Sequence, residues 1–136
     1  MNQKYDIDVP EAGTLEEILD VDFDKIDKIQ IEVLFPIRSV EITDSSTIQT
    51  YLNRFQSSNF SRDSDNLDRS SFGGGGGIYT TLYQKGQEVA SFNFGSKSFS
   101  FSRADFCGSI FYHTEERLWQ DDLLEGIEGW VYQDAD

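Results

Sequence analysis

The sequence of 136 residues is poor in the residues that cross-link a chain or ligate metals. It has one cysteine, Cys107, and one histidine, His113, so there is no internal disulfide framework. A zinc site would need carboxylates for most of its ligands. Cations are also scarce, because 11 Lys and Arg stand against 25 Asp and Glu, which gives a formal net charge of −14. Binding to a nucleic-acid backbone or to an anionic membrane surface depends on Lys and Arg, so the sequence disfavours direct contact with either.

Long hydrophobic runs are absent too. No apolar stretch approaches the roughly 18 residues of a membrane-spanning helix, so membrane insertion is not expected. Residues 1–10 lack the charged and then apolar pattern of a secretory signal, but a mature secreted chain would look the same after cleavage. The compartment therefore stays open between cytoplasmic and extracytoplasmic. The hydrophobic content of 38% is low, yet 14% of the residues are aromatic, which favours one globular domain over residues 1–136 rather than a disordered chain.

The net charge is confined to the two ends of the sequence. Residues 1–32 and residues 113–136 each carry −7, whereas residues 33–70 carry −1 and residues 71–112 carry +1. Such asymmetry bears on solubility and on partners rather than on fold. It favours a basic protein or peptide as partner. The alternative is an acidic surface that is well solvated and contacts no charged partner.

Hydrophobic periodicity predicts an α+β fold, in which an antiparallel β-sheet of five or six strands has helices packed on one face. Capping boxes at Thr14 with Glu17 and at Ser46 with Gln49 begin two of the expected helices. Helices are expected over 15–20, 46–56 and 114–132. Strands are expected over 28–35, 39–43, 78–83, 89–94, 98–102 and 110–112, the first two as a hairpin around Pro36–Arg38.

Residues 57–77 are rich in Ser, Asn, Asp and Gly and are predicted to form a mobile surface loop with a short strand near Phe60. The five glycines from Gly73 to Gly77 invite comparison with a phosphate-binding loop. Such a loop needs a Lys followed by Ser or Thr, and then a helix. Here the strand-like residues Ile78 to Thr80 follow, so a flexible loop is the better interpretation.

The acidic run Asp20–Asp27 resembles a calcium-binding loop only in its spacing. That loop needs Gly at its sixth position and Glu at its twelfth, but Lys25 and Ile31 occupy them. A solvated acidic turn is therefore expected, with no metal and no cofactor.

The sequence also gives little evidence for a group of catalytic residues. If Cys107 and His113 share a strand they lie about 20 Å apart, which is too far for a thiol–imidazole dyad. Carboxylate pairs of the glycosidase type are numerous, but they lie in terminal runs rather than around an aromatic cleft. We therefore expect no catalytic residues and no enzymatic activity.

The aromatic residues divide into two groups. The phenylalanines at alternating positions, Phe92, Phe94, Phe99 and Phe101, are expected to form the core under the helices. The Tyr and Trp residues could serve either core packing or recognition of a partner, because both residue types pack well and are enriched at protein interfaces.

The order Ile29–Ile31, Val40–Asp44, the helix Ile48–Phe55 and then Tyr79–Tyr83 resembles small Gram-positive extracytoplasmic domains of unknown function, often borne on lipoproteins. The resemblance covers residues 26–102. The chain departs from it by lacking a signal segment and by its acidic C-terminal extension. It is also similar to small acidic immunity proteins of bacterial toxin systems. Neither resemblance implies an enzyme or a cofactor.

The leading hypothesis is a non-enzymatic protein-binding module, an acidic inhibitor or immunity protein that occludes a basic partner such as a bacterial toxin. The alternatives are an extracytoplasmic lipoprotein-type domain with an unknown ligand, a DNA-mimic inhibitor and a small hydrolase. The oligomeric state stays open. The candidate partner-binding residues are Glu115, Glu116, Trp119, Asp121, Asp122, Glu125, Glu128 and Trp130.

Overall fold

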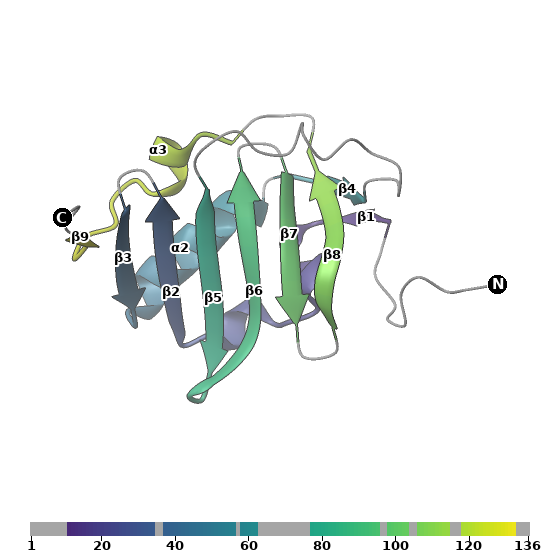
Figure 1. Cartoon of the computed structure of the whole chain (residues 1–136). Helices are drawn as coiled ribbons and strands as arrows, with labels where there is room; N and C mark the ends of the chain where they lie inside the picture. Colours follow the sequence, from purple (N-terminus) through teal and green to yellow (C-terminus); the bar gives the residue numbers. More distant parts are fainter. Residues whose placement is uncertain are drawn as a thin grey trace.

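The computed structural model describes residues 11–34, 37–56, 58–62, 77–95, 98–103, 106–114 and 118–132. It contains one antiparallel sheet in the order β1-β4-β8-β7-β6-β5-β2-β3-β9, with helices behind one face (Figure 1). The strands are β1 (Ala12–Gly13), β2 (Lys28–Leu34), β3 (Ile37–Ile42), β4 (Phe60–Arg62), β5 (Ile78–Gln84), β6 (Gln87–Gly95), β7 (Ser98–Arg103), β8 (Phe106–His113) and β9 (Val131–Tyr132). The helices are α1 (Leu15–Leu19), the 3-10 turn η1 (Phe23–Lys25), α2 (Ser45–Gln56) and α3 (Gln120–Leu123).

The predicted α+β class is confirmed, but the predicted number of strands is wrong, because the sheet has nine strands rather than five or six. The additional strands β1, β4 and β9 contain only two or three residues each and lie toward the edges of the sheet. Strands of that length carry no alternation that a sequence pattern could detect. Only β4 was anticipated, as the short strand near Phe60.

The core lies between the sheet and the helices α1 and α2. Alternate residues of the central strands are buried on this side, and several of the phenylalanine rings meet edge to face. The Phe60 and Phe99 ring centroids are 4.9 Å apart, and those of Phe55 and Phe92 are 5.2 Å apart. In the part of the chain that the structure describes, no helix covers the opposite face of the central strands (Figure 1). The prediction that Phe92, Phe94, Phe99 and Phe101 form the core is confirmed.

One of the two predicted capping boxes is confirmed. Thr14 Oγ1 accepts a hydrogen bond from the Glu17 N–H at 3.4 Å, and Glu17 Oε1 accepts one from the Thr14 N–H at 2.9 Å. These bonds satisfy amides that the first turn of a helix leaves without partners.

The predicted box of Ser46 with Gln49 is wrong, because α2 begins one residue earlier. Asp44 caps the helix instead, with its Oδ2 accepting from the Thr47 N–H at 2.9 Å. Hydrogen bonds from Thr47 hold the pKa of the Asp44 carboxyl below its usual value. The Gln49 side chain is used elsewhere and donates to the carbonyl oxygen of Phe23 at 2.7 Å. This bond joins α2 to η1.

The predicted helix over 114–132 is also wrong. Of its described residues, 114 and 118–132, only Gln120–Leu123 is helical, and the chain then runs without regular structure to β9. Gly126 and Gly129 have φ values of +83° and +91°, a left-handed backbone that stops a helix and that glycine adopts at low cost. The apolar side chains that suggested a helix are still buried at Leu123, Leu124 and Ile127.

The predicted loop over 57–77 falls mostly on residue 57 and residues 63–76, which lie outside the described residues. Its predicted mobility therefore stays a prediction. In the segments that the structure describes, no helix has the length and apolar character needed to cross a membrane.

Candidate functional site

The last described segment of the chain, Leu118–Tyr132, packs against the rest of the fold through apolar side chains. Leu123, Leu124 and Ile127 are 3%, 7% and 8% exposed and belong to the core. Arg54, in the last turn of α2, adds two hydrogen bonds from Nη1, to the carbonyl oxygens of Leu123 at 3.0 Å and Glu125 at 2.7 Å. A guanidinium therefore satisfies carbonyls that the end of α3 would leave exposed. We call Leu118–Tyr132 the C-terminal segment.

Packing by those side chains leaves the acidic residues of the C-terminal segment in solvent. Asp121, Asp122, Glu125 and Glu128 are all exposed. The segment contains no Lys or Arg, so its own sequence supplies no cation to neutralise them. The structure thus brings four of the candidate binding residues together on one docked segment. Glu115 and Glu116, the other two candidate acids, lie outside the described residues.

The two candidate tryptophans have different environments. Trp119 is 59% exposed, whereas Trp130 is partly buried against the core. The Trp130 indole N–H donates to the Ile127 carbonyl oxygen at 3.0 Å, and the Arg38 guanidinium lies over its ring with Cζ 4.6 Å from the centroid. Trp130 is therefore committed to holding the segment in place, and Trp119 is the indole presented at the surface.

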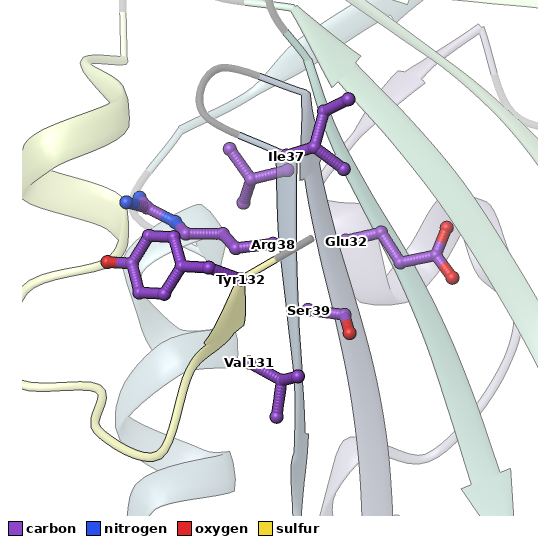
Figure 2. Close-up of a pocket in the computed structure, with 7 residues that line it drawn as sticks. Glu32, Ile37, Arg38, Ser39, Val131 and Tyr132 are labelled. Atoms are coloured by element: carbon purple, nitrogen blue, oxygen red, sulfur yellow. The ribbon is translucent and has the colours of Figure 1, made fainter. Parts of the chain in front are cut away.

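A groove of about 330 Å³ crosses the edge of the sheet where β9 pairs with β3 (Figure 2). The register sets Arg38 opposite Tyr132 and Ser39 opposite Val131. Figure 2 shows the Arg38 and Tyr132 side chains on one side of the strands and those of Glu32 and Ile37 on the other. We call this the edge groove. Its lining residues are Val33, Arg38 and Tyr132 on the helix side, and Glu32, Ile37, Ser39 and Val131 on the open side.

Three hydrophobic residues that surround this groove were not among the candidates predicted from the sequence. Ile37, Val131 and Tyr132 are 52%, 67% and 58% exposed. Together with Trp119 they make up four of the five large hydrophobic side chains that the described residues expose, the fifth being Tyr79. Val131 lies within the predicted helix over 114–132, but the structure places it in β9. Exposed large apolar groups gathered in one region are typical of an interaction site.

The acidic residues near the N-terminus form a separate group. Asp20, Asp22, Asp24 and Asp27 are exposed. Asp27 immediately precedes β2, and its backbone N–H donates to the Tyr83 carbonyl oxygen at 3.1 Å, whereas the edge groove lies near the other end of β2. Like the four acids of the C-terminal segment, these residues lie in solvent. The two groups form two surfaces rather than one.

Several of these acids have structural partners. Asp22 Oδ1 accepts from the Asp24 N–H at 3.0 Å, and Asp27 Oδ2 accepts from the Lys85 N–H at 3.0 Å. Within the described ranges, no group of three or more His, Cys, Asp or Glu side chains could hold a metal ion. Cys107 and His113 lie on the same strand, β8, six residues apart.

Comparisons with protein-family models, with curated proteins and with solved structures find no match for the chain. Its function is therefore inferred from the surface described above. That surface combines carboxylates with exposed aromatic and aliphatic groups. Such a combination suits recognition of another protein, because apolar groups supply binding free energy while charges steer and orient the approach.

Proposed function

We propose that this protein is a non-enzymatic binding module that recognises a basic protein through its C-terminal segment. The observation that carries the proposal is the coincidence of exposed carboxylates and exposed large hydrophobic side chains on one docked segment and the strand beside it. Trp119 is the anchor, because a large aromatic side chain buried at the centre of an interface contributes most of the binding energy. Asp121, Asp122, Glu125 and Glu128 attract the cationic surface of the partner and raise its association rate.

An acidic surface of this kind suits an inhibitor or immunity protein that covers the cationic surface of a toxin. Such a protein needs rapid and specific association, and it needs no chemistry of its own. A DNA mimic would need carboxylates in rows that follow a nucleic-acid backbone. The exposed acids are instead spread over the surface, since Glu32, Glu41 and Asp44 are exposed as well as the two groups described above, and this scatter favours a protein partner over an enzyme's DNA site.

The proposal is tested by capture of binding proteins from the source cell on the immobilised chain, with two charge variants compared. The first variant carries Asp121→Asn, Asp122→Asn, Glu125→Gln and Glu128→Gln. The second carries Asp20→Asn, Asp22→Asn, Asp24→Asn and Asp27→Asn, which removes the same charge at the other acidic group. We expect one basic protein to be retained by the wild-type chain and by the second variant, and lost with the first.

The association rate of the captured protein is then measured against salt concentration. We expect the rate to fall as ionic strength rises, because screening weakens attraction between exposed charges. A rate that does not change with salt, or equal loss of the partner from both variants, contradicts the proposal. Trp119→Ala should raise the dissociation rate without changing the salt dependence, because it removes packing rather than charge.

A further inference from the structure

We propose that the open side of the edge groove binds a lysine or arginine side chain carried by an extended segment of that basic partner. This inference rests on the proposed function and deepens it, because it names the chemical group that enters one defined place on the surface. The groove lies where the C-terminal segment joins the sheet, so a partner held by that segment lies directly beside it.

The strand register builds a row of four side chains across the open face of the sheet. Ser39 pairs with Val131 on one side and with Glu32 on the other, and Glu32 pairs in turn with Tyr79. The Glu32 carboxylate therefore lies in the middle of the row. The Tyr79 hydroxyl donates to Ser91 Oγ at 3.3 Å, which fixes the direction of that ring. Ile37, two residues before Ser39 on β3, forms the upper wall of the groove (Figure 2).

This arrangement matches the two parts of a long basic side chain. Ile37 and Val131 offer apolar surface to an aliphatic stem, and both are more than half exposed. The Glu32 carboxylate offers an acceptor for the cationic end, and the Ser39 hydroxyl lies next to it in the row. Lysine and arginine commonly bury their stems along apolar surface while the charged end reaches a polar partner.

The Glu32 carboxylate has no ion pair or hydrogen bond within the described part of the chain. Glu41, by contrast, lies two residues beyond Ser39 on the same face and forms an ion pair with Lys28 at 3.9 Å. The groove's own cation, Arg38, points to the other side of the strands, where it lies over Trp130 (Figure 2). Glu32 is thus left for a cation from outside.

The negative charge of the chain favours a different protein, rather than a second copy of this chain, as the partner that occupies the edge groove. Each chain carries −14, and the four exposed acids of the C-terminal segment lie close to the groove in sequence. Joining two such edges would bring like charges together, which opposes association. The same negative potential attracts a cationic segment of a partner.

The test uses short, blocked, threonine-rich peptides with one variable central residue, titrated into the full-length chain labelled with ¹⁵N. The central residue is lysine, arginine, norleucine or diaminopropionate. Norleucine keeps the stem without the charge, and diaminopropionate keeps the charge on a short stem. We expect the lysine and arginine peptides to shift the amide signals of Ile37, Ser39 and Val131 and to bind at least about fivefold more tightly than the other two.

Two single variants supply the matched control. Glu32→Gln should weaken the lysine peptide about tenfold, because it removes a charged hydrogen-bond acceptor. Glu41→Gln removes the same charge from the same face and should weaken it less than twofold. Equal effects from the two variants, or equal binding of the lysine and norleucine peptides, would overturn the groove assignment. The capture experiment above would still stand in that case, because it depends on the C-terminal acids and not on Glu32.

Discussion

The guanidinium of Arg38 lies over the indole of Trp130, with its Cζ atom 4.6 Å from the ring centroid and 5.9 Å from that of Tyr132. This contact joins β3 to residues at the far end of the sequence. Arg38 Nε is buried and has no hydrogen-bond partner among the residues that the structure describes. The aromatic rings therefore supply the main compensation for its partial loss of water.

Replacing Arg38 with Met keeps the stem and removes the cation. We expect β9 to loosen at a cost of about 1 kcal/mol, the usual size of a partly buried cation–π contact. Hydrogen exchange of the Val131 and Tyr132 amides should accelerate, as should loss of Trp130 fluorescence on heating. Lys25→Met, which removes an exposed cation elsewhere, serves as the control. Unchanged exchange at both amides would show that the stacking does not hold the strand.

Arg54→Ala removes both hydrogen bonds that hold the carbonyls of Leu123 and Glu125. We expect the free energy of unfolding in urea to fall by about 2 kcal/mol, since hydrogen bonds from charged groups are worth more than neutral ones. Binding of the basic partner should weaken as well, because the C-terminal segment loses the hydrogen bonds that hold it to α2. Arg54→Lys should give an intermediate loss. A stable variant with full binding would show that apolar packing alone docks the segment.

The buried hydroxyls of Tyr51 and Thr80 lie 2.7 Å apart, and neither side chain has exposed surface. Tyr51→Phe leaves the Thr80 hydroxyl without its partner and should cost about 1–3 kcal/mol. Adding Thr80→Val should recover much of that loss, because both polar groups are then gone. A double-mutant cycle by urea denaturation measures this coupling. Strictly additive losses would contradict the hydrogen bond.

Alkaline pH should destabilise the fold through its buried tyrosines. Burial raises the pKa of Tyr112 from 10.0 to about 12, against the opposing charges of Arg62 and Arg103. Burial also raises the pKa of Tyr51, which the hydrogen bond with Thr80 and the charge of Arg54 oppose. The unfolded chain loses these protons first, so stability is complete below pH 10 and declines as the pH rises from 10 toward 12.

Urea denaturation midpoints measured across this pH range test whether the buried tyrosines cause the loss of stability. Tyr112→Phe lowers stability at neutral pH but should flatten the decline, since about 2 kcal/mol of it comes from this one residue by pH 12. An identical decline in Tyr112→Phe and in the wild-type chain would place the alkaline loss elsewhere.

Local patterns predicted most of the sheet. Two-residue alternation marked β2, β5, β6 and β7, because a half-buried strand must place apolar residues on one side. The helix α2 followed from Ile48, Tyr51, Leu52 and Phe55, all of which are buried. Its first residue was missed by one position, because Ser46 and Asp44 offer equally good caps until the rest of the fold engages Gln49.

The C-terminal segment shows where such patterns fail. The spacing of Leu123, Leu124 and Ile127 fits a helix, but it also fits an irregular chain that docks these three side chains, with Gly126 between them and Gly129 just after them. The choice between Trp119 and Trp130 as a binding residue was likewise undecided in the sequence. It depended on Arg38, a residue 92 positions before Trp130.

The amino-acid sequence determined the charge of the two ends, the α+β class and the side chains of the core, since each of these follows from composition or from neighbours a few residues apart. Tertiary structure alone decided that β9 closes the edge beside β3, that Ile37, Val131 and Tyr132 remain exposed around a groove, and that the two acidic groups lie apart. These features arise from contacts between distant parts of the chain, whose register no local periodicity records.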